Sequence, residues 1–157
     1  MSLPPASQRE FLQAYDALLA RWPIPVESVD VPSAYGMTRV QMCGRADGPA
    51  LMLLCQFGAT STVWFGNVGH LACRYRLYAV DPIGQPGRSV AGSRPITGAS
   101  DLMGWLDGLL SELGLHSVSL CGHSYGAWLS LNYAMHAPQR VRQLALLDPP
   151  TASPACG

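Results

Sequence analysis

Residues 117–136 read SVSLCGHSYGAWLSLNYAMH and predict three consecutive pieces of structure. Val118 and Leu120 belong to a short apolar run of the kind that forms a buried parallel strand. The pentapeptide G-H-S-Y-G follows at residues 122–126, and after it come good helix formers as far as Pro138, which cannot continue a helix. The stretch is therefore expected to be a strand, a tight turn and a helix.

The turn itself has the form G-x-S-x-G, in which each position has a mechanical reason. The chain must reverse within about one residue, so Ser124 is expected at a strained backbone position, with positive φ. Gly122 and Gly126 let strand and helix approach without a Cβ clash. The alternative is a glycine-rich turn with an incidental serine. A dinucleotide-binding turn is disfavoured, because the sequence holds no G-x-G-x-x-G.

In this strand-and-helix setting the pentapeptide resembles the nucleophile elbow of the α/β-hydrolase superfamily. The resemblance implies that Ser124 attacks an acyl carbonyl and that the Tyr125 backbone N–H is one donor of the oxyanion hole. The second donor is expected from the loop after the third strand. The family commonly has a His-Gly pair there, whereas this chain has Cys55 and Gln56, so Phe57 is the expected donor.

Outward from the elbow, apolar runs and helical periodicities alternate along the chain, which predicts an α/β fold with a mainly parallel sheet flanked by helices. The resemblance implies one incomplete α/β-hydrolase domain over residues 1–157, lacking the last two strands and the lid. We expect an N-terminal helix at about 7–21, a core over 26–148 and an irregular tail at 149–157. Strands are expected near 26–31, 38–42, 50–55, 75–80, 117–121 and 141–147, and further helices near 63–73 and 102–113.

The remaining catalytic residues do not follow the family order of serine, acid and histidine. After Ser124 the only acidic residue is Asp148, and the only histidine, His136, precedes it. Twelve residues of helix separate His136 from Ser124, which is roughly 18 Å at 1.5 Å per residue and far beyond proton-transfer reach. His123 is expected to point away from the serine and to pack or form a hydrogen bond. The sequence thus predicts a nucleophile without its base.

Other polar residues are expected to have structural roles. Asp81 is expected to hold together the glycine-rich loop 81–89, and His70 and His116 to lie at the surface. The cysteines are expected to be mostly buried free thiols in a reducing cytoplasm, because they show no C-x-x-C spacing.

Composition narrows the partners. The ten basic residues, all arginine, balance ten acidic ones, so no nucleic-acid partner is expected. The absence of lysine is typical of a GC-rich, bacterial-like gene. No apolar run approaches the ~20 residues of a membrane span, and the start is no signal peptide, which favours a cytoplasmic protein. No metal and no organic cofactor is expected.

Three functions stay open on the sequence. The first is an esterase-like serine hydrolase for a small-molecule acyl substrate, truncated and therefore weak or inactive alone. The second is related acyltransferase or cofactor-free haloperoxidase chemistry, which uses the same elbow. The third is a non-catalytic interaction module or pseudo-enzyme. Residues 141–147 are expected to be an apolar edge strand, through which the chain forms a homodimer or aggregates.

Overall fold

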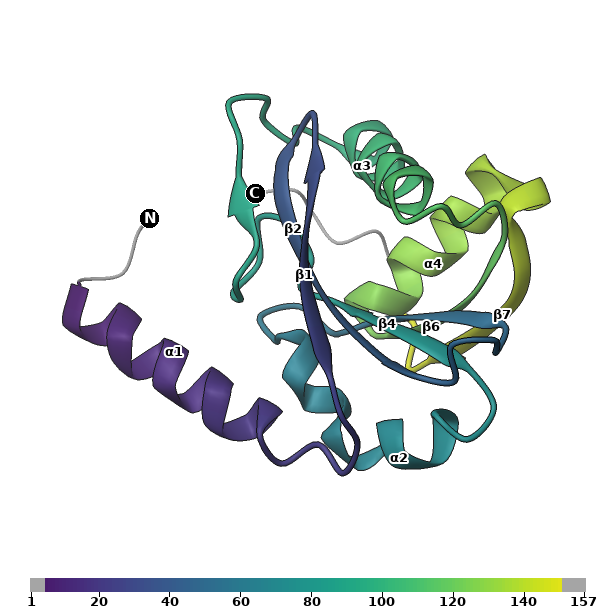
Figure 1. Cartoon of the computed structure of the whole chain (residues 1–157). Coiled ribbons are helices and arrows are strands. Elements are labelled where there is room, and N and C mark those ends of the chain that lie inside the picture. Colours follow the sequence, from purple (N-terminus) through teal and green to yellow (C-terminus); the bar gives the residue numbers. More distant parts are fainter. Residues whose placement is uncertain (1–4, 151–157) are drawn as a thin grey trace.

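A single mixed sheet with helices on both faces makes up the fold (Figure 1). The structure is a computed structural model, and it describes residues 5–150. The elements are α1 (Pro5–Leu19), β1 (Glu27–Ser33), β2 (Gly36–Gly44), β3 (Ala50–Leu54), the 3₁₀ helix η1 (Ser61–Gly66), α2 (Val68–Leu71), β4 (Arg76–Val80), β5 (Val90–Ala91), α3 (Ala99–Glu112), β6 (Val118–His123), α4 (Tyr125–His136), the 3₁₀ helix η2 (Pro138–Arg140) and β7 (Val141–Leu147).

The strands lie in the order β1-β2-β4-β3-β6-β7, and β5 adds a short pairing to β2. β4, β3, β6 and β7 run parallel to one another, whereas β1, β2 and β5 are antiparallel to their neighbours. β3 is the central strand, and its Met52, Leu53 and Leu54 are fully buried, as a strand covered on both faces requires. The expected α/β sheet flanked by helices is confirmed.

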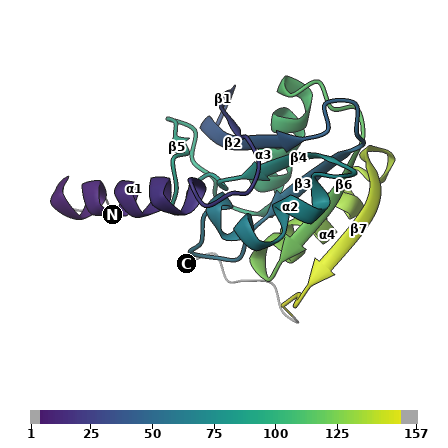
Figure 2. The ribbon, with the colours of Figure 1, turned by 60° about the horizontal axis from the view of Figure 1, so that its bottom comes forward.

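Two layers of helices cover the sheet (Figures 1 and 2). α3 and α4 pack on one face, where Trp105, Leu129 and Tyr133 join the larger apolar core. η1 and α2 pack on the other face, where Trp64 and Val68 join a second core. Burial of these aromatic and branched side chains is the main favourable term that holds the layers together.

The expected helix over 63–73 is wrong in form. The segment divides into η1 and the single turn α2, with Asn67 between them. Thr60 accepts a hydrogen bond from the Thr62 N–H and begins η1, while Gly66 interrupts the continuation into one helix. β5 was not expected either. It pairs at Gly36, whose missing side chain allows the Val90 carbonyl to approach: an added Cβ would lie 2.2 Å from that oxygen.

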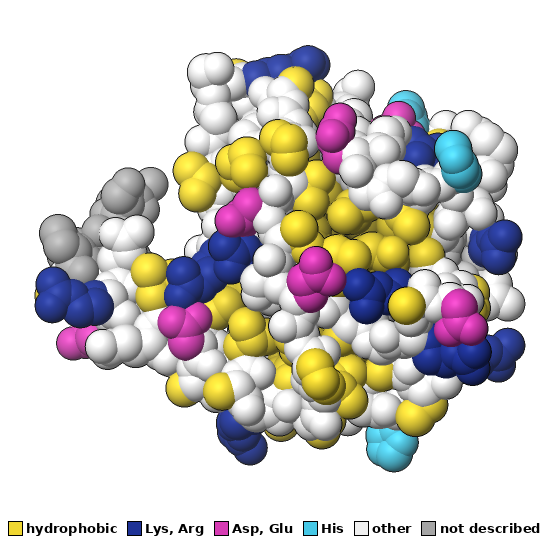
Figure 3. Space-filling view, in the orientation of Figure 1, with side chains coloured by type: hydrophobic (Ala, Val, Ile, Leu, Met, Phe, Trp, Pro, Cys, Tyr) yellow, Lys and Arg dark blue, Asp and Glu magenta, His cyan; other side chains and the backbone are white. Residues whose placement is uncertain are grey.

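The surface carries no segment suited to a bilayer and no large field of one charge. None of the helices within residues 5–150 is long and apolar enough to cross a membrane. On the face shown in Figure 3, hydrophobic side chains gather in the middle, and basic and acidic side chains are interspersed around them. Exposed pairs such as Arg45 with Asp47 contribute little to stability, because water and salt screen them.

The cysteines of the described chain are free. Cys43 and Cys55 are buried as expected, and burial raises the pKa of the Cys43 thiol to about 11. Cys73 is exposed, which corrects the expectation that it is buried. Because α2 ends at Leu71, Cys73 falls in the turn that follows rather than on the inner face of a longer helix.

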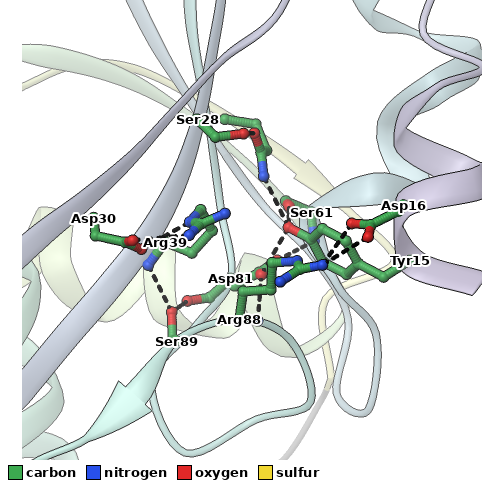
Figure 4. Close-up of polar contacts among 10 residues, drawn as sticks. Tyr15, Asp16, Ser28, Asp30, Arg39, Ser61, Asp81, Arg88 and Ser89 are labelled. Atoms are coloured by element: carbon green, nitrogen blue, oxygen red, sulfur yellow. Dashed lines mark hydrogen bonds and ion pairs between the residues drawn. The ribbon is translucent and has the colours of Figure 1, made fainter. Parts of the chain in front are cut away.

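Asp81 holds its own loop, as the sequence predicts, and it also joins three other segments (Figure 4). Its Oδ2 accepts the Arg88 N–H at 2.8 Å, which closes loop 81–89. Its Oδ1 accepts the Ser61 N–H at 2.7 Å, at the start of η1. The carboxylate is fully buried, so these donors replace the water it has lost. Gly87 makes room for it, because a Cβ there would lie 2.7 Å from the carboxyl carbon.

The third segment at Asp81 is α1. The Tyr15 hydroxyl donates to Asp81 Oδ2 at 2.9 Å and accepts from Gln41 Nε2 at 2.9 Å. One residue further along α1, Asp16 pairs with Arg88 at 2.6 Å (Figure 4). α1 is therefore held to the sheet by a polar anchor around Tyr15 in addition to apolar packing.

Candidate active site

Ser124 lies between β6 and α4 with φ 52° and ψ −111°, so the expected positive φ is confirmed. Within residues 5–150 only one other non-glycine residue, Asp148, has positive φ. The Ser124 N–H donates to the Leu147 carbonyl at 2.8 Å, and the Ser124 carbonyl accepts from the Trp128 N–H at 3.0 Å. The strained residue is thus fixed from the neighbouring strand and from its own helix.

The two glycines of the pentapeptide are required by space. A Cβ on Gly122 would lie 2.1 Å from the Gly126 carbonyl oxygen, where strand and helix cross. A Cβ on Gly126 would lie 2.0 Å from the Leu54 carbonyl oxygen, at the end of β3. The first residues of α4 therefore rest directly on the carboxyl end of β3, and any side chain here would push the elbow off the sheet.

The loop after β3 reaches the same edge of the sheet. It forms a tight turn in which the Ala59 N–H donates to the Gln56 carbonyl at 3.2 Å. Gly58 takes the positive φ of 76°, which fits a type II turn with Phe57 and Gly58 at its centre. Gln56 carries its side chain without strain, since the glycine two residues later makes the reversal. The Phe57 N–H has no acceptor among residues 5–150.

Two side-chain contacts join this loop to the elbow. Gln56 Oε1 and His123 Nδ1 are 3.1 Å apart. The Phe57 ring packs edge-on against the Tyr125 ring with centroids 6.1 Å apart, and Tyr125 stacks on Trp128 at 5.9 Å. Phe57 nevertheless stays 70% exposed. A row of three aromatic rings therefore lies beside Ser124.

Two further groups fix the loop after β3 from its other side. Gln85 of loop 81–89 accepts the Gly58 N–H at 3.2 Å. The Cys55 thiol lies 3.5 Å from the Ala59 carbonyl, and burial, with a smaller contribution from Asp81, raises its pKa to about 12. A thiol with so high a pKa is protonated at neutral pH and is no competing nucleophile.

The other titratable residues lie apart from the elbow, except for Asp148. His136 is exposed in the last turn of α4, with its ring 6.2 Å from that of Tyr133. His70 in α2 and His116 after α3 are exposed, as expected. Asp148 is exposed and directly follows Leu147, whose carbonyl holds the Ser124 N–H.

Sequence reasoning thus located Ser124, Tyr125, Gly122, Gly126 and Phe57, and the structure brings them to the carboxyl ends of β3 and β6. It missed what Gln56 and Gln85 do. The one available signal was the departure from the family's His-Gly pair after the third strand.

The elbow at the carboxyl edge of a mixed α/β sheet defines a class of protein, and sequence comparison agrees with it. Residues 49–155 match the family model of the alpha/beta hydrolase fold. The chain belongs to the α/β hydrolase fold family.

Its relatives include carboxylesterases of Bacillus subtilis (strain 168). The chain is 34% identical over 142 residues to carboxylesterase YbfK, which covers 90% of this chain and 48% of that protein. It is 32% identical to the uncharacterised carboxylesterase nap, over 94% of this chain and 50% of the relative. The crystal structure of naproxen esterase from Bacillus subtilis superimposes with a TM-score of 0.88 at 31% identity, over 95% of this chain and 52% of the other. The chain spans about half the length of the curated relatives it matches.

Proposed function

We propose that this chain is the nucleophile-bearing part of a carboxylesterase-type serine hydrolase, with Ser124 as the nucleophile. The observation that carries the proposal is the backbone of Ser124, at φ 52° between β6 and α4 with both flanking glycines in enforced contact. Such a strained residue persists only where surrounding structure holds it, and strain of this kind concentrates at functional sites. The carboxylesterase relatives support an ester as the substrate class.

In the proposed reaction, Ser124 Oγ attacks the carbonyl carbon of an ester and the carbonyl oxygen becomes an oxyanion. The backbone N–H groups of Phe57 and Tyr125 donate to that oxyanion. Support comes from the Phe57 N–H, which has no acceptor among the described residues, and from the ring contact that keeps the two residues together. Donors fixed in advance stabilise the developing charge without reorganising. Collapse of the tetrahedral intermediate expels the alcohol and leaves an acyl group on Ser124.

Proton transfer is the part of the reaction that this chain supports least. The general base in the family is a histidine that follows the acid in the sequence. Here His123 is bonded to Gln56, and the other three histidines are exposed on or after helices away from the elbow. Without a base in reach, the chain alone retains only binding and oxyanion stabilisation, so it is a very weak esterase.

Steady-state hydrolysis of p-nitrophenyl butyrate tests this proposal. Measured beside carboxylesterase YbfK, the chain should turn over at least about 10⁴-fold more slowly, the loss expected when a triad base is absent. Ser124→Ala should remove what activity remains, whereas Ser111→Ala, on the exposed side of α3, should leave it unchanged. Turnover within about a hundredfold of the relative that depends on Ser124 would mean that a base acts here after all.

A non-catalytic interaction module is the second candidate, and β7 is the observation that favours it. Four consecutive residues of this edge strand, 142–145, are exposed, including Leu144. Acyl transfer and haloperoxidase chemistry remain variants of the first candidate, since they differ in what accepts or attacks the acyl group and use the same elbow.

A further inference from the structure

The Gln56–His123 hydrogen bond joins the two segments that carry the proposed oxyanion donors. Gln56 directly precedes Phe57, and His123 directly precedes Ser124 and Tyr125. We propose that Gln56 and His123 are positioning residues that fix the Phe57 N–H relative to the elbow, in the place where the family has a His-Gly pair. This inference rests on the proposed function.

The other attachments of the loop do not reach the elbow. Gly58 is held by Gln85, which belongs to loop 81–89 beyond β4. The turn bond from Ala59 to Gln56 is internal to the loop. Among residues 5–150, the Gln56–His123 contact is the one side-chain hydrogen bond between this loop and the elbow. Removing it leaves the exposed Phe57 ring against Tyr125 as the direct side-chain contact between the two donor segments.

The chemistry of the pair defines the state of His123. An amide oxygen only accepts, so the proton of the bond is on Nδ1 of the imidazole. Protonation of the ring adds a proton at Nε2 and leaves Nδ1–H unchanged, so the bond is kept in both charge states. His123 is therefore a donor that supports the loop at any pH at which the protein folds, and its Nδ1 is not available as a base.

Three variants separate this role from general stability. Gln56→Met keeps the length of the side chain and removes the acceptor, and His123→Phe keeps a ring and removes the donor. Gln56→Glu restores an acceptor. Both residues are half-buried, so the melting temperatures of all three variants should stay close to that of the wild type, as is usual for substitutions outside the core.

The first readout is the second-order rate constant for phosphonylation of Ser124 by a fluorophosphonate, followed by intact-mass spectrometry. Gln56→Met and His123→Phe should each react about tenfold more slowly, because a small misplacement of one oxyanion donor costs part of its effect. The double variant should be no slower than the single ones, since both remove the same bond. Gln56→Glu should react within about twofold of the wild type.

The second readout does not need a reactive serine. In ¹H–¹⁵N spectra the Phe57 amide signal should shift in Gln56→Met and return toward its wild-type position in Gln56→Glu, and the His123 Nδ1 shift should report a protonated nitrogen. If the wild type fails to react while these shifts behave as expected, the proposed function fails and the positioning role stands. If Gln56→Met reacts like the wild type with an unmoved Phe57 signal, or if the two single losses add in the double variant, the positioning role is wrong.

Discussion

Ser124 combines a strained backbone with a fixed surrounding, and both belong to the same arrangement. Its φ of 52° is held by the Leu147 carbonyl on one side and by Trp128 on the other. Gly122 and Gly126 allow the approach of strand and helix that makes this conformation necessary. The free energy stored in such a position is of order 1–3 kcal/mol, and the rest of the fold must supply it.

Replacing Ser124 should reveal that strain. Ser124→Gly removes the Cβ that disfavours positive φ, while Ser124→Ala keeps it. After allowing for the greater freedom of glycine in the unfolded chain, about 0.4–1 kcal/mol, the glycine variant should be more stable than the alanine variant by about 1 kcal/mol. Urea unfolding of both proteins measures the difference. Equal midpoints, or a more stable alanine variant, would mean that the backbone here is relaxed.

At the scale of elements, α1 depends on the buried hydroxyl of Tyr15. Burial, and then the Asp81 carboxylate, raises the pKa of Tyr15 from 10.0 to about 12. Because the folded protein favours the protonated phenol, this group stabilises the fold below pH ~10, and its contribution falls as the pH rises from about 10 to about 12. The expected consequence is an alkaline weakening of the attachment of α1.

Tyr15→Phe provides the test. Near pH 8 the variant should be less stable by about 2 kcal/mol, because Gln41 and Asp81 each lose a buried partner. As the pH approaches 12 the gap between wild type and variant should narrow, since the wild type then loses the same contribution. Parallel urea titrations at pH 8 and pH 11.5 measure both gaps. Identical gaps at the two pH values would exclude Tyr15 as the titrating group.

Arg140 joins α3 to the start of β7. Its guanidinium donates to Asp107 Oδ1 at 2.7 Å and to the Leu115 carbonyl at 2.7 Å. Arg140→Met should destabilise the protein by about 2 kcal/mol, because a partly buried acceptor and a carboxylate lose their partner. The control is Arg45→Met in an exposed pair, which should cost under about 0.5 kcal/mol. Thermal unfolding compares the two, and similar losses would argue against a special role for Arg140.

The elements that the sequence predicted are those whose signals are local. The elbow is encoded within five residues, and β3 within one apolar run, so both were found. β5 was missed because two residues carry no pattern, and its pairing depends on Gly36, far away in the sequence. The bonds Tyr15–Asp81 and Gln56–His123 span 66 and 67 residues, so only the folded sheet brings these side chains together.

At the scale of the whole molecule, β7 forms one edge of the sheet in the described chain (Figures 1 and 2). Its exposed side chains include Leu144 and Leu147, and Arg142 is the only charge within it. An edge of this kind offers unpaired N–H and C=O groups to another strand. We propose that a second copy of the chain pairs here, antiparallel about Leu144, which sets each Arg142 opposite Leu146 and keeps like charges apart.

Leu144→Lys should break this association. In the symmetric pairing the two lysines would face each other, and like charges directly opposite are destabilising. Leu131→Lys on α4 is the control, since Leu131 is 39% exposed and Leu144 is 37% exposed. Sedimentation at tens of micromolar should show dimers or larger species for the wild type and the control, and monomers for Leu144→Lys. A wild type that sediments as a monomer of 16.8 kDa would rule out association through β7.

The most direct test of the central claim, that Ser124 is the nucleophile of this fold, is where a fluorophosphonate attaches. The chain should be incubated with the reagent in excess, and the modified residue located by peptide mapping. The predicted result is a single adduct on Ser124, formed more slowly than on an intact carboxylesterase, absent from Ser124→Ala and retained in Ser111→Ala. The absence of any adduct on Ser124, or label spread equally over the exposed serines, would contradict the claim.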